Sequence, residues 1–352
     1  MSSKESASGA KAEANEAKRS LRVGVIGAGV MGSNHARVLA GLPDTALIGV
    51  VDPLPAHRAR ATELAGCRTF ATLDELIADG VEAVTIAAPT HLHHEISLAC
   101  IARGIHVLCE KPLTLSAQES LQLVKAERAS GRRLVQVGYM RRYDSDYRHI
   151  HDTIRSGRIG QPILIRQRHH NPLTFNNFQA QQLIASSAAH DIDLFRWLTG
   201  EEISVVTCAA KSSDDGSTLT VLLTLTSESG ILGVVEVGRG PGMQYDIGLD
   251  LVAGHGSLTL GSPSLTTSAV ADGLAAGRLP DSWIERFDGA YRTQNATWLT
   301  AVANDSIDGP STYDGYATNA VADAALAALR TGGAQVVHQI PAGGLEQDRP
   351  RR

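Results

Sequence analysis

A lysine followed by proline comes directly after a short apolar run that is typical of a buried strand. The run is Ile105–Leu108, and the chain continues as Cys109-Glu110-Lys111-Pro112. Lysine is seldom buried, and proline removes the backbone donor that a continuing strand would need. Ligands bind beyond the carboxyl ends of strands in open α/β sheets. We therefore predict that Lys111 reaches into an active-site crevice, although an ion pair with Glu110 would also account for its charge.

A glycine-rich turn near the N-terminus has the spacing of a dinucleotide-binding loop. Gly27, Gly29 and Gly32 lie between a predicted strand at Leu21–Ile26 and a helical pattern. The first glycine permits a tight turn, the second lets a pyrophosphate approach the backbone, and the third lets the helix pack close to the strand. The start of such a helix offers N–H groups to phosphates. We therefore expect a dinucleotide along this turn, with Val30 and Met31 beside it.

The next predicted strand, Ala46–Val51, ends at an acidic residue, Asp52, twenty residues after Gly32. A carboxylate at this place accepts hydrogen bonds from a ribose 2′-hydroxyl and repels a 2′-phosphate. The position therefore favours NAD over NADP, although the nearby Arg58 and Arg60 leave NADP open. An ordinary strand–helix turn with an acidic strand end is the structural alternative.

Three histidines open a later helix, in the segment Pro89-Thr90-His91-Leu92-His93-His94. They lie too close together in sequence to converge readily on a metal, and no set of Cys and His residues lies nearby. We therefore predict no metal site. Pro89, Thr90 and His93 are expected to lie along the cofactor instead.

Strands and helices alternate through the first 140 residues. Helices are predicted at Leu73–Ala78, Pro89–Arg103 and Ser116–Ser130, and further strands at Ala83–Ala87, Ile105–Leu108 and Leu134–Val137. Such alternation is typical of a doubly wound parallel sheet, the Rossmann arrangement.

The pattern changes near residue 140 to a helix, a series of strands and two final helices. The strands are expected at Pro162–Arg168, Ile203–Ala210, Leu219–Thr226, Ile231–Val237, Ile247–Ala253 and Ser257–Leu260, and the helices at Tyr143–Ser156, His190–Leu198, Trp283–Asp305 and Tyr313–Leu329. This order predicts an α+β domain with a large, mostly antiparallel, open sheet. An open sheet face without helices needs a partner, so we expect a homodimer or homotetramer.

Length and composition agree with a two-domain globular protein. We expect a dinucleotide-binding domain at 21–140 and a substrate-binding domain at 141–342, with tails at 1–20 and 343–352. A net charge of −5 gives no reason to expect nucleic acid or an anionic membrane as a partner. No apolar run approaches the roughly 18 residues that a membrane helix needs. The four scattered cysteines indicate free thiols and a cytoplasmic location.

With these motifs in view, the chain resembles the Gfo/Idh/MocA oxidoreductases, and within them the inositol 2-dehydrogenases, from about Leu21 to about Val337. Besides the glycine turn, the resemblance rests on the segments Pro89–His93, Glu110–Pro112, Gly138–Asp144, His169–Pro172 and His190–Leu194. It implies hydride transfer between NAD(P) and a secondary alcohol of a cyclic polyol. It also implies that the second-domain sheet builds the substrate pocket and an oligomer interface.

The resemblance assigns catalytic roles to two residues. Lys111 takes the place of the lysine beside the nicotinamide, next to Glu110, and His190 takes the place of the acid–base histidine. An imidazole with an ordinary pKa near 6.5 accepts the hydroxyl proton, and an ammonium stabilises the developing alkoxide. The alternative for His190 is a plain helix-start residue, with Asp191 and Asp193 suited to the helix dipole.

Substrate hydroxyls are expected to contact a second group of residues. The resemblance places Arg141, His169 and Asn171 there, and we add Met140, Ser186 and Tyr245. His169 and Asn171 alternate along one strand and therefore share a face, although a polar solvent face is the alternative. The sequence leaves open whether Arg141 or its neighbour Arg142 points to the substrate.

Ser186 departs from the family pattern, which has an aspartate four residues before the histidine. A serine forms hydrogen bonds but carries no negative charge beside an imidazolium, so His190 should be less basic and Lys111 more involved in proton handling. The substitution also removes charge where a substrate group would lie. This departure argues against plain myo-inositol as the substrate and keeps an aminocyclitol, a keto-inositol and another sugar derivative open.

The sequence does not set the direction of the reaction, because the same residues serve oxidation and reduction. An NAD(P)H-dependent reductase of a keto-sugar or sugar nucleotide is thus the neighbouring interpretation. A non-catalytic dinucleotide-binding sensor is a further alternative, as is an enzyme that keeps NAD bound and uses redox only as an intermediate step.

Overall fold

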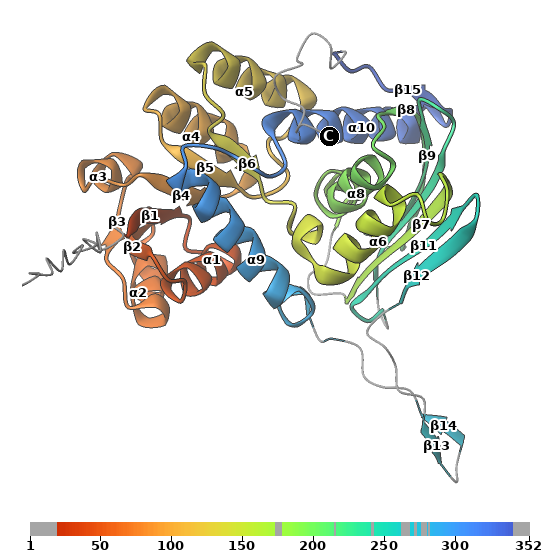
Figure 1. Ribbon diagram of the computed structural model, residues 1–352, viewed down its shortest axis with the longest axis horizontal. Coiled ribbons are helices and arrows are strands. Elements are labelled where there is room, and N and C mark those ends of the chain that lie inside the picture. The colour runs from red at the N-terminus through yellow and green to blue at the C-terminus, as the bar shows by residue number, and fades with distance from the viewer. Residues whose placement is uncertain are drawn as a thin grey trace, which may run out of the picture.

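The structure is a computed structural model of the chain, and it describes residues 20–172, 178–214, 216–240, 243–261, 268–270, 273–275, 280 and 282–340. The tails predicted at 1–20 and 343–352 lie outside these residues, apart from Ser20. Two sheets, each with helices packed on it, lie side by side and are bridged by long C-terminal helices (Figure 1).

The first sheet is parallel and, in the described residues, six-stranded, with the order β3-β2-β1-β4-β5-β6. Its strands are β1 (Leu21–Ile26), β2 (Thr45–Val51), β3 (Thr69–Phe70), β4 (Ala83–Ile86), β5 (His106–Cys109) and β6 (Val135–Val137). The helices between them are α1 (Val30–Ala40), α2 (Pro55–Ala65), α3 (Leu73–Ala78), α4 (Thr90–Ala102) and α5 (Ala117–Ser130). The strand order reverses between β1 and β4, and ligands bind at such a point in doubly wound sheets.

The second sheet has seven strands in the described residues, with the order β12-β11-β7-β10-β9-β8-β15. They are β7 (Pro162–Pro172), β8 (Ile203–Ser212), β9 (Thr218–Ser227), β10 (Leu232–Gly240), β11 (Asp246–Ala253), β12 (Gly256–Leu260) and β15 (Gln335–Val336). Neighbouring β7 and β10 run parallel, and the other described pairs run antiparallel. A small separate hairpin consists of β13 (Ser268–Val270) and β14 (Gly273–Ala275) (Figure 1). Both predicted sheet classes, and so the predicted fold class, are confirmed.

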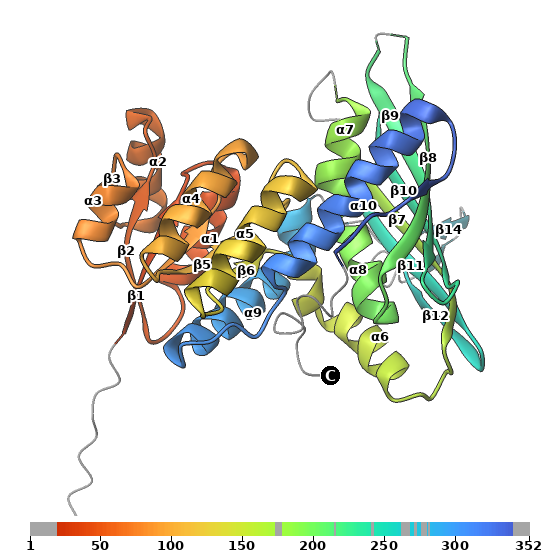
Figure 2. The ribbon, with the colours of Figure 1, turned by 90° about the horizontal axis from the view of Figure 1, so that it is seen from above.

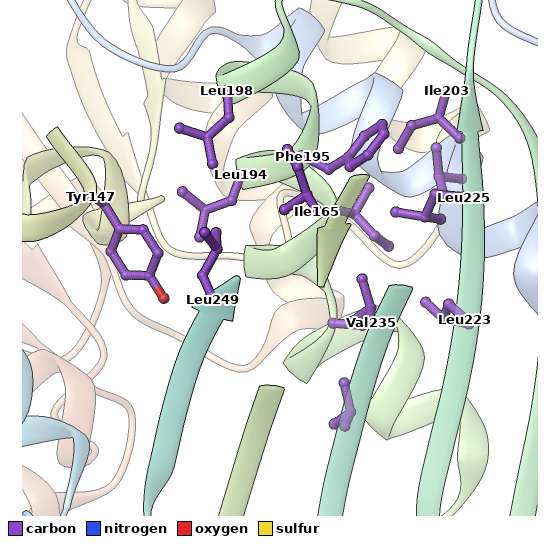
Figure 3. Close-up of a cluster of buried hydrophobic side chains, with 14 of the residues drawn as sticks. Tyr147, Ile165, Leu194, Phe195, Leu198, Ile203, Leu223, Leu225, Val235 and Leu249 are labelled. Atoms are coloured by element: carbon purple, nitrogen blue, oxygen red, sulfur yellow. The ribbon is translucent and has the colours of Figure 1, made fainter. Parts of the chain in front are cut away.

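Helices cover one face of the second sheet, and no helix of the described residues covers the other, bare face (Figure 2). The covering helices are α6 (Ser145–Arg155), α8 (Ala189–Thr199) and α10 (Thr312–Thr331). Leu194 and Phe195 of α8 pack there against strand residues such as Leu223 and Val235 (Figure 3). This arrangement turns the inward-pointing strand positions, including those of β7 and β10, toward the helices.

The helix α9 (Trp283–Ala303) contributes to the cores of both domains. Its first turns, with Phe287 and Tyr291, belong to the core of the second sheet, whereas Trp298 packs with Val23 and Val25 of β1. Trp298 is fully buried there. One helix thus fixes the two sheets relative to each other.

The segment that follows β6 differs from its prediction. Instead of one helix at Tyr143–Ser156, a 3₁₀ helix at Met140–Tyr143 precedes α6. Asp144 separates the two because its backbone is extended and its carboxylate accepts hydrogen bonds from the first amides of α6. The 3₁₀ turn is what brings Met140 and Arg141 to the region between the sheets.

The sequence prediction lacked six α-helices and strands of the described residues: α2, β3, α7 (Ala180–Gln182) and the short strands β13, β14 and β15. Three of them lie close to the cofactor and substrate regions. The helix α2 has no regular apolar stripe, and β3 is two residues long, so neither had a periodic signal. The third is the short α-helix α7, which continues into a π-helical turn at Leu183–Ser187. Within the described residues, no helix is long and apolar enough to cross a membrane.

Candidate active site

A cavity of about 360 Å³ lies between the two sheets, and both domains supply its walls. All eight residues predicted for catalysis or substrate binding line it: Lys111, Met140, Arg141, His169, Asn171, Ser186, His190 and Tyr245. Of the residues predicted for the cofactor, Met31, Pro89, Thr90, His93 and Glu110 also line it. The other residues predicted for the cofactor do not line this cavity. They lie beside it, at the turn from β1 into the first residues of α1 and directly after β2: Gly27, Gly29, Val30, Gly32 and Asp52.

Lys111 is held in this cavity by hydrogen bonds at both ends. Its backbone N–H donates to Oε2 of Glu110 at 3.1 Å, and its Nζ donates to the carbonyl oxygen of Ser186 at 3.1 Å. Burial lowers the pKa of Lys111; Glu110 opposes this, and Arg141 and Arg239 lower the pKa further. The lysine therefore gives up its proton more readily than an exposed lysine would.

Glu110 is buried and bonded to a partner that the sequence did not indicate. Its Oε1 lies 2.9 Å from Nε2 of His35, on α1. The other nitrogen of that imidazole faces the amide of Asn295, on α9, and the ring packs edge-on against Tyr291. The structure therefore does not show a simple ion pair between the side chains of Glu110 and Lys111. The carboxylate instead binds the backbone amide of Lys111 and, through His35, connects it to α1 and α9.

His190 begins the helix α8 in a buried, positively charged setting. Its Nδ1 has no hydrogen-bond partner among the described residues. The pKa of His190 lies well below its ordinary value, first because of burial and then because Lys111, Arg141 and His169 repel the imidazolium. At neutral pH the ring is thus a neutral imidazole, which is the form that accepts a proton.

Ser186 lies in the π-helical turn directly before α8. Its carbonyl oxygen holds Lys111, whereas no hydrogen bond joins its hydroxyl to His190 in the described part of the chain. π-Helical turns often occur at functional sites because they displace a few backbone groups from the regular helix. Here the turn sets a neutral carbonyl, and no carboxylate, beside Lys111.

Arg141 is fully buried, and its guanidinium is paired with Asp191. Nη1 lies 2.6 Å from Oδ1 of Asp191, whose Oδ2 lies 2.8 Å from Nδ1 of His169. Burial raises the pKa of Asp191, but the charges and hydrogen bonds of Arg141 and His169 outweigh burial. The pKa is lowered overall, so the carboxylate stays charged. Burial together with Arg141 lowers the pKa of His169 to about 4. Asp191 therefore positions both Arg141 and His169. From the sequence, Asp191 was expected only to interact favourably with the dipole of the helix that starts at His190.

Arg141 and Arg142 differ in their partners and in whether they line the cavity. Arg142 turns away from the cavity and pairs with Asp193 at 2.5 Å and with Asp314 at 3.0 Å. Arg141 lines the cavity. Adjacent residues on the 3₁₀ turn point in different directions, which the sequence alone does not reveal.

Arg239 lines the cavity and was missed by the sequence analysis. It lies on β10 opposite Asn171 of β7, so that both residues face the same side of the sheet. Its guanidinium lies over the ring of Phe178, 4.3 Å from the ring centre. The strand was predicted to end at Val237, but it runs to Gly240, and the alternation of inward residues Val235 and Val237 continues to Arg239. That signal would have found Arg239. Trp283 and Tyr291, both on α9, are two further lining residues that the sequence did not indicate.

The cofactor turn has the shape that a dinucleotide needs. A Cβ on Gly29 would meet no atom within 4 Å, whereas one on Gly32 would lie 1.8 Å from the carbonyl oxygen of Gly27. Gly29 is the N-cap of α1 and makes no side-chain cap, so the first amides of the helix face outward. Open space beside outward amides is what a pyrophosphate requires.

Asp52 lies at the end of β2 next to this turn. It accepts hydrogen bonds from the amides of Ala28 and Leu54, each at 2.9 Å. Burial raises the pKa of Asp52, but the two amides and His57 lower it overall, so it is a carboxylate at neutral pH. Arg58 donates to the carbonyl oxygens of Asp52 and Pro53. A charged acid at this place suits a free ribose 2′-hydroxyl.

His93 is buried between two loops of the site. Its Nδ1 lies 3.0 Å from the carbonyl oxygen of Pro112, and its Nε2 lies 2.8 Å from that of Ala88. It thereby ties the loop after β4 to the loop that carries Lys111. Among the described residues, no group of three or more His, Cys, Asp or Glu side chains could hold a metal ion.

Comparison with known proteins identifies the class. An oxidoreductase family with an NAD-binding Rossmann fold matches residues 21–139, and the GFO/IDH/MocA C-terminal domain matches residues 147–259. The chain is 37% identical over 334 residues to inositol 2-dehydrogenase 4 of Saccharopolyspora erythraea, covering 93% of this chain and 98% of that protein. Inositol 2-dehydrogenase of Rhodococcus erythropolis is 35% identical, with 91% and 96% covered.

A solved structure of similar shape is that of myo-inositol dehydrogenase from Lactobacillus casei in complex with NAD(H) and myo-inositol. The two chains are 25% identical and superpose with a TM-score of 0.85, and the match covers 91% of this chain and 98% of the Lactobacillus casei chain. The chain therefore belongs to the GFO/IDH/MocA oxidoreductase family. It is an NAD-dependent oxidoreductase, as the sequence predicted.

Two glycine substitutions separate cofactor binding from folding. Gly29→Ala is expected to leave the thermal unfolding temperature unchanged and to weaken NADH binding by at least about tenfold, because the methyl group enters the space for the pyrophosphate. Gly32→Ala is the contrasting variant, expected to destabilise the fold by about 1–3 kcal/mol through the close approach to Gly27. NADH fluorescence titration and thermal unfolding measure both, and full NADH affinity in Gly29→Ala would contradict the assignment.

Proposed function

We propose that the protein oxidises a secondary hydroxyl of a cyclic polyol to the ketone, with His190 as the general base and Lys111 as the group that stabilises the alkoxide. The observation that carries this proposal is that a neutral buried imidazole and a lysine ammonium line one cavity with the loops at the ends of the NAD-binding strands. The names of the relatives, which are inositol dehydrogenases, support a cyclic polyol as the substrate class.

The reaction converts R₂CH–OH and NAD⁺ to R₂C=O, NADH and a proton. Bound NAD⁺ supplies the acceptor for the hydride, that is, for two electrons and the carbon-bound hydrogen. The hydroxyl proton passes to the imidazole of His190 and then to solvent. Lys111 stabilises the negative charge that develops on the oxygen, in a setting where burial strengthens electrostatic interactions.

The remaining lining residues orient the ring. His169 and Asn171 face the cavity from β7, and Tyr245 lies directly before β11. Arg141 pairs with Asp191, so its main role is to hold His169 through that carboxylate and to add positive charge. Asp191 binds Nδ1 of His169, and the other ring nitrogen, Nε2, is available to the substrate. Fixed polar groups of this kind select which hydroxyl faces the nicotinamide.

The same residues serve reduction of the corresponding ketone, since His190 then returns the proton. No feature of the described residues favours a non-catalytic sensor, because both the base and the ammonium are present in the cavity. A cytoplasmic location stays a prediction, which the free cysteines of the described chain support.

We also propose that the bare face of the second sheet joins copies of the chain in a dimer or tetramer. Leu222 on β9, Leu232 on β10 and Val252 on β11 are 43%, 50% and 37% exposed. Each follows or precedes a buried residue on its strand, so the three lie on the face away from the helices. Exposed apolar side chains on an uncovered sheet favour association.

Replacing the lysine tests the proposed reaction. Lys111→Ala is expected to lower kcat/KM for polyol oxidation by at least about 100-fold, while NADH affinity stays within about threefold, because the ammonium acts on the alkoxide. NADH formation at its absorption band and fluorescence titration give the two values. Turnover that survives this substitution would show that the central assignment is wrong.

The pH dependence tests His190. Because its pKa is depressed, kcat/KM for oxidation should rise through an acidic limb below pH 6.5 as the ring loses its proton, and then level off. Ser186→Asp adds an opposite charge near the ring, which raises the pKa and moves the limb upward by about one unit. Ser186→Ala is the uncharged control and should leave the limb in place. An unmoved limb in Ser186→Asp would refute this account.

Sheet-mediated association predicts that a charge on the bare face breaks the oligomer. Leu232→Arg should reduce the mass measured by light scattering after gel filtration to that of one chain. Leu115→Arg, at a similarly exposed leucine in the other domain, is the matched control and should leave the mass unchanged. Equal masses for both variants would exclude this face as the interface.

A further inference from the structure

His35 lies on α1 and is fully buried, and the proposed reaction gives it no role. It follows Met31 of the cavity wall by one helical turn, so the two side chains lie on the same side of the helix. Nε2 of His35 lies 2.9 Å from Oε1 of Glu110. Because a carboxylate only accepts hydrogen bonds, Nε2 carries the hydrogen and donates it to Glu110.

The amide of Asn295 holds the other nitrogen of this ring. Nδ1 of His35 lies 3.2 Å from Nδ2 and 3.3 Å from Oδ1 of the amide, and Nδ2 also donates to the carbonyl oxygen of Tyr291 at 2.8 Å. The imidazole packs edge-on against Tyr291, with 5.7 Å between the ring centres. Both partners belong to α9, which is packed into the cores of both domains. His35 is therefore fixed in position and in orientation.

Glu110 transmits this fixed geometry to Lys111. Its Oε1 accepts from His35, and its Oε2 accepts from the backbone N–H of Lys111 at 3.1 Å. The side chains of His35 and Glu110 are 0% and 6% exposed, so bulk water does not simply replace a donor that is lost there. Rotation of the carboxylate away from His35 would also break its bond to the lysine amide. The bond from His35 thus fixes the loop that carries the ammonium.

Glu110 also affects the charge of the lysine. Burial lowers the pKa of Lys111, and the negative charge of Glu110 opposes this more than any other group does. The remaining groups around the ammonium lie on other elements and partly cancel: Asp191 on α8 raises the pKa, Arg141 and Arg239 lower it, and His169 and His190 are neutral rings at neutral pH. The carboxylate that His35 holds is therefore the main charge that keeps Lys111 protonated.

We propose that His35 is a positioning residue of the reaction, which acts by donating to Glu110 and thereby fixing the carboxylate that holds and supports the Lys111 ammonium. This inference rests on the proposed function, in which that ammonium stabilises the alkoxide. His35 does not line the cavity, so it acts through Glu110. Since α1 also offers its first amides to the dinucleotide, one helix places both the cofactor and the lysine.

Two substitutions separate the hydrogen bond from the presence of the ring. His35→Leu removes the donor, and we expect it to lower kcat for the best substrate in a panel of inositols and hexoses by about tenfold to a hundredfold, because a small displacement of a reacting group has an effect of this size. KM and NADH affinity should stay within about threefold. His35→Gln keeps an N–H near the place of Nε2 and should restore kcat to within about threefold of wild type.

His106 provides a matched control for the loss of a buried histidine. Its Nε2 lies 2.9 Å from Oδ1 of Asp305, at the start of β5, whereas Glu110 directly follows the end of that strand. His106→Leu therefore removes a histidine–carboxylate bond of equal length from the same domain, and kcat should stay within about threefold of wild type. Thermal unfolding and NADH titration verify that each variant is folded at the assay temperature.

The pH dependence reports whether His35 acts on the ammonium. On the basic side, kcat should fall as Lys111 loses its proton, because the charged form stabilises the alkoxide. Glu110→Gln removes the charge that raises the pKa of Lys111, so this basic limb should move to lower pH. His35→Leu leaves a buried carboxylate without its side-chain donor, which favours the protonated acid, and should move the limb in the same direction. The limb should stay in place in His35→Gln and His106→Leu.

A double-mutant cycle tests the route through Glu110. The variant that combines His35→Leu with Glu110→Gln should have a kcat within about threefold of that of Glu110→Gln alone, because the histidine then has no carboxylate to position. Losses that multiply in the double variant would show that His35 acts by another route and would contradict the inference.

An unchanged kcat in His35→Leu, an equal loss in His106→Leu, or no recovery in His35→Gln would overturn the inference while the proposed function stands. Absence of NADH formation by the wild type with every polyol would instead contradict the proposed function. Competitive acetylation of the purified enzyme, followed by mass spectrometry of the peptide that contains Lys111, measures the protonation of the lysine without turnover. Acetylation should begin at lower pH in His35→Leu and Glu110→Gln than in wild type, and coincident curves would overturn the inference.

Discussion

The structure depends on placing a lysine ammonium in a largely enclosed space between two domains. Burial disfavours the charged form of Lys111, and the nearby arginines disfavour it further. What keeps the side chain in place is therefore a set of hydrogen bonds: the amide to Glu110 and the ammonium to the carbonyl of Ser186. One bond belongs to the NAD-binding domain and the other to the second domain, so the lysine is positioned only when both are assembled.

The domains are held together by polar and apolar contacts that converge on this loop. Glu110 reaches His35 on α1, which contacts Asn295 on α9, and α9 itself is packed into the cores of both sheets. On the other side, Asp191 fixes Arg141 and His169 beside His190. A buried ion pair of this kind is weak support for stability but leaves little freedom in geometry. The enzyme thus holds its reacting groups through rigid elements of each domain.

Burial and neighbouring charges set the electrostatic character of the site. His190 keeps a low pKa first because it is buried and then because Lys111, Arg141 and His169 repel its charged form. The ammonium of Lys111 donates to the carbonyl oxygen of Ser186. Burial among cations therefore gives the site a proton acceptor of low basicity.

The sequence by itself determined the parallel sheet and the glycine turn with Asp52, since these follow from local periodicity and from motifs at strand ends. The residues that line the cavity were named mainly by the resemblance to the family, and only the position of Lys111 was indicated by its strand end. The sequence did not determine which of Arg141 and Arg142 lines the cavity, because a 3₁₀ turn sends adjacent side chains apart. Nor did it assign Asp191, whose partners lie 50 and 22 residues away in the chain. Arg239 and the bond from Glu110 to His35 likewise arise only when distant strands and helices pack together. Local signals specify elements and their ends, whereas partners and charge balance depend on contacts between residues far apart in sequence, which only the tertiary structure decides.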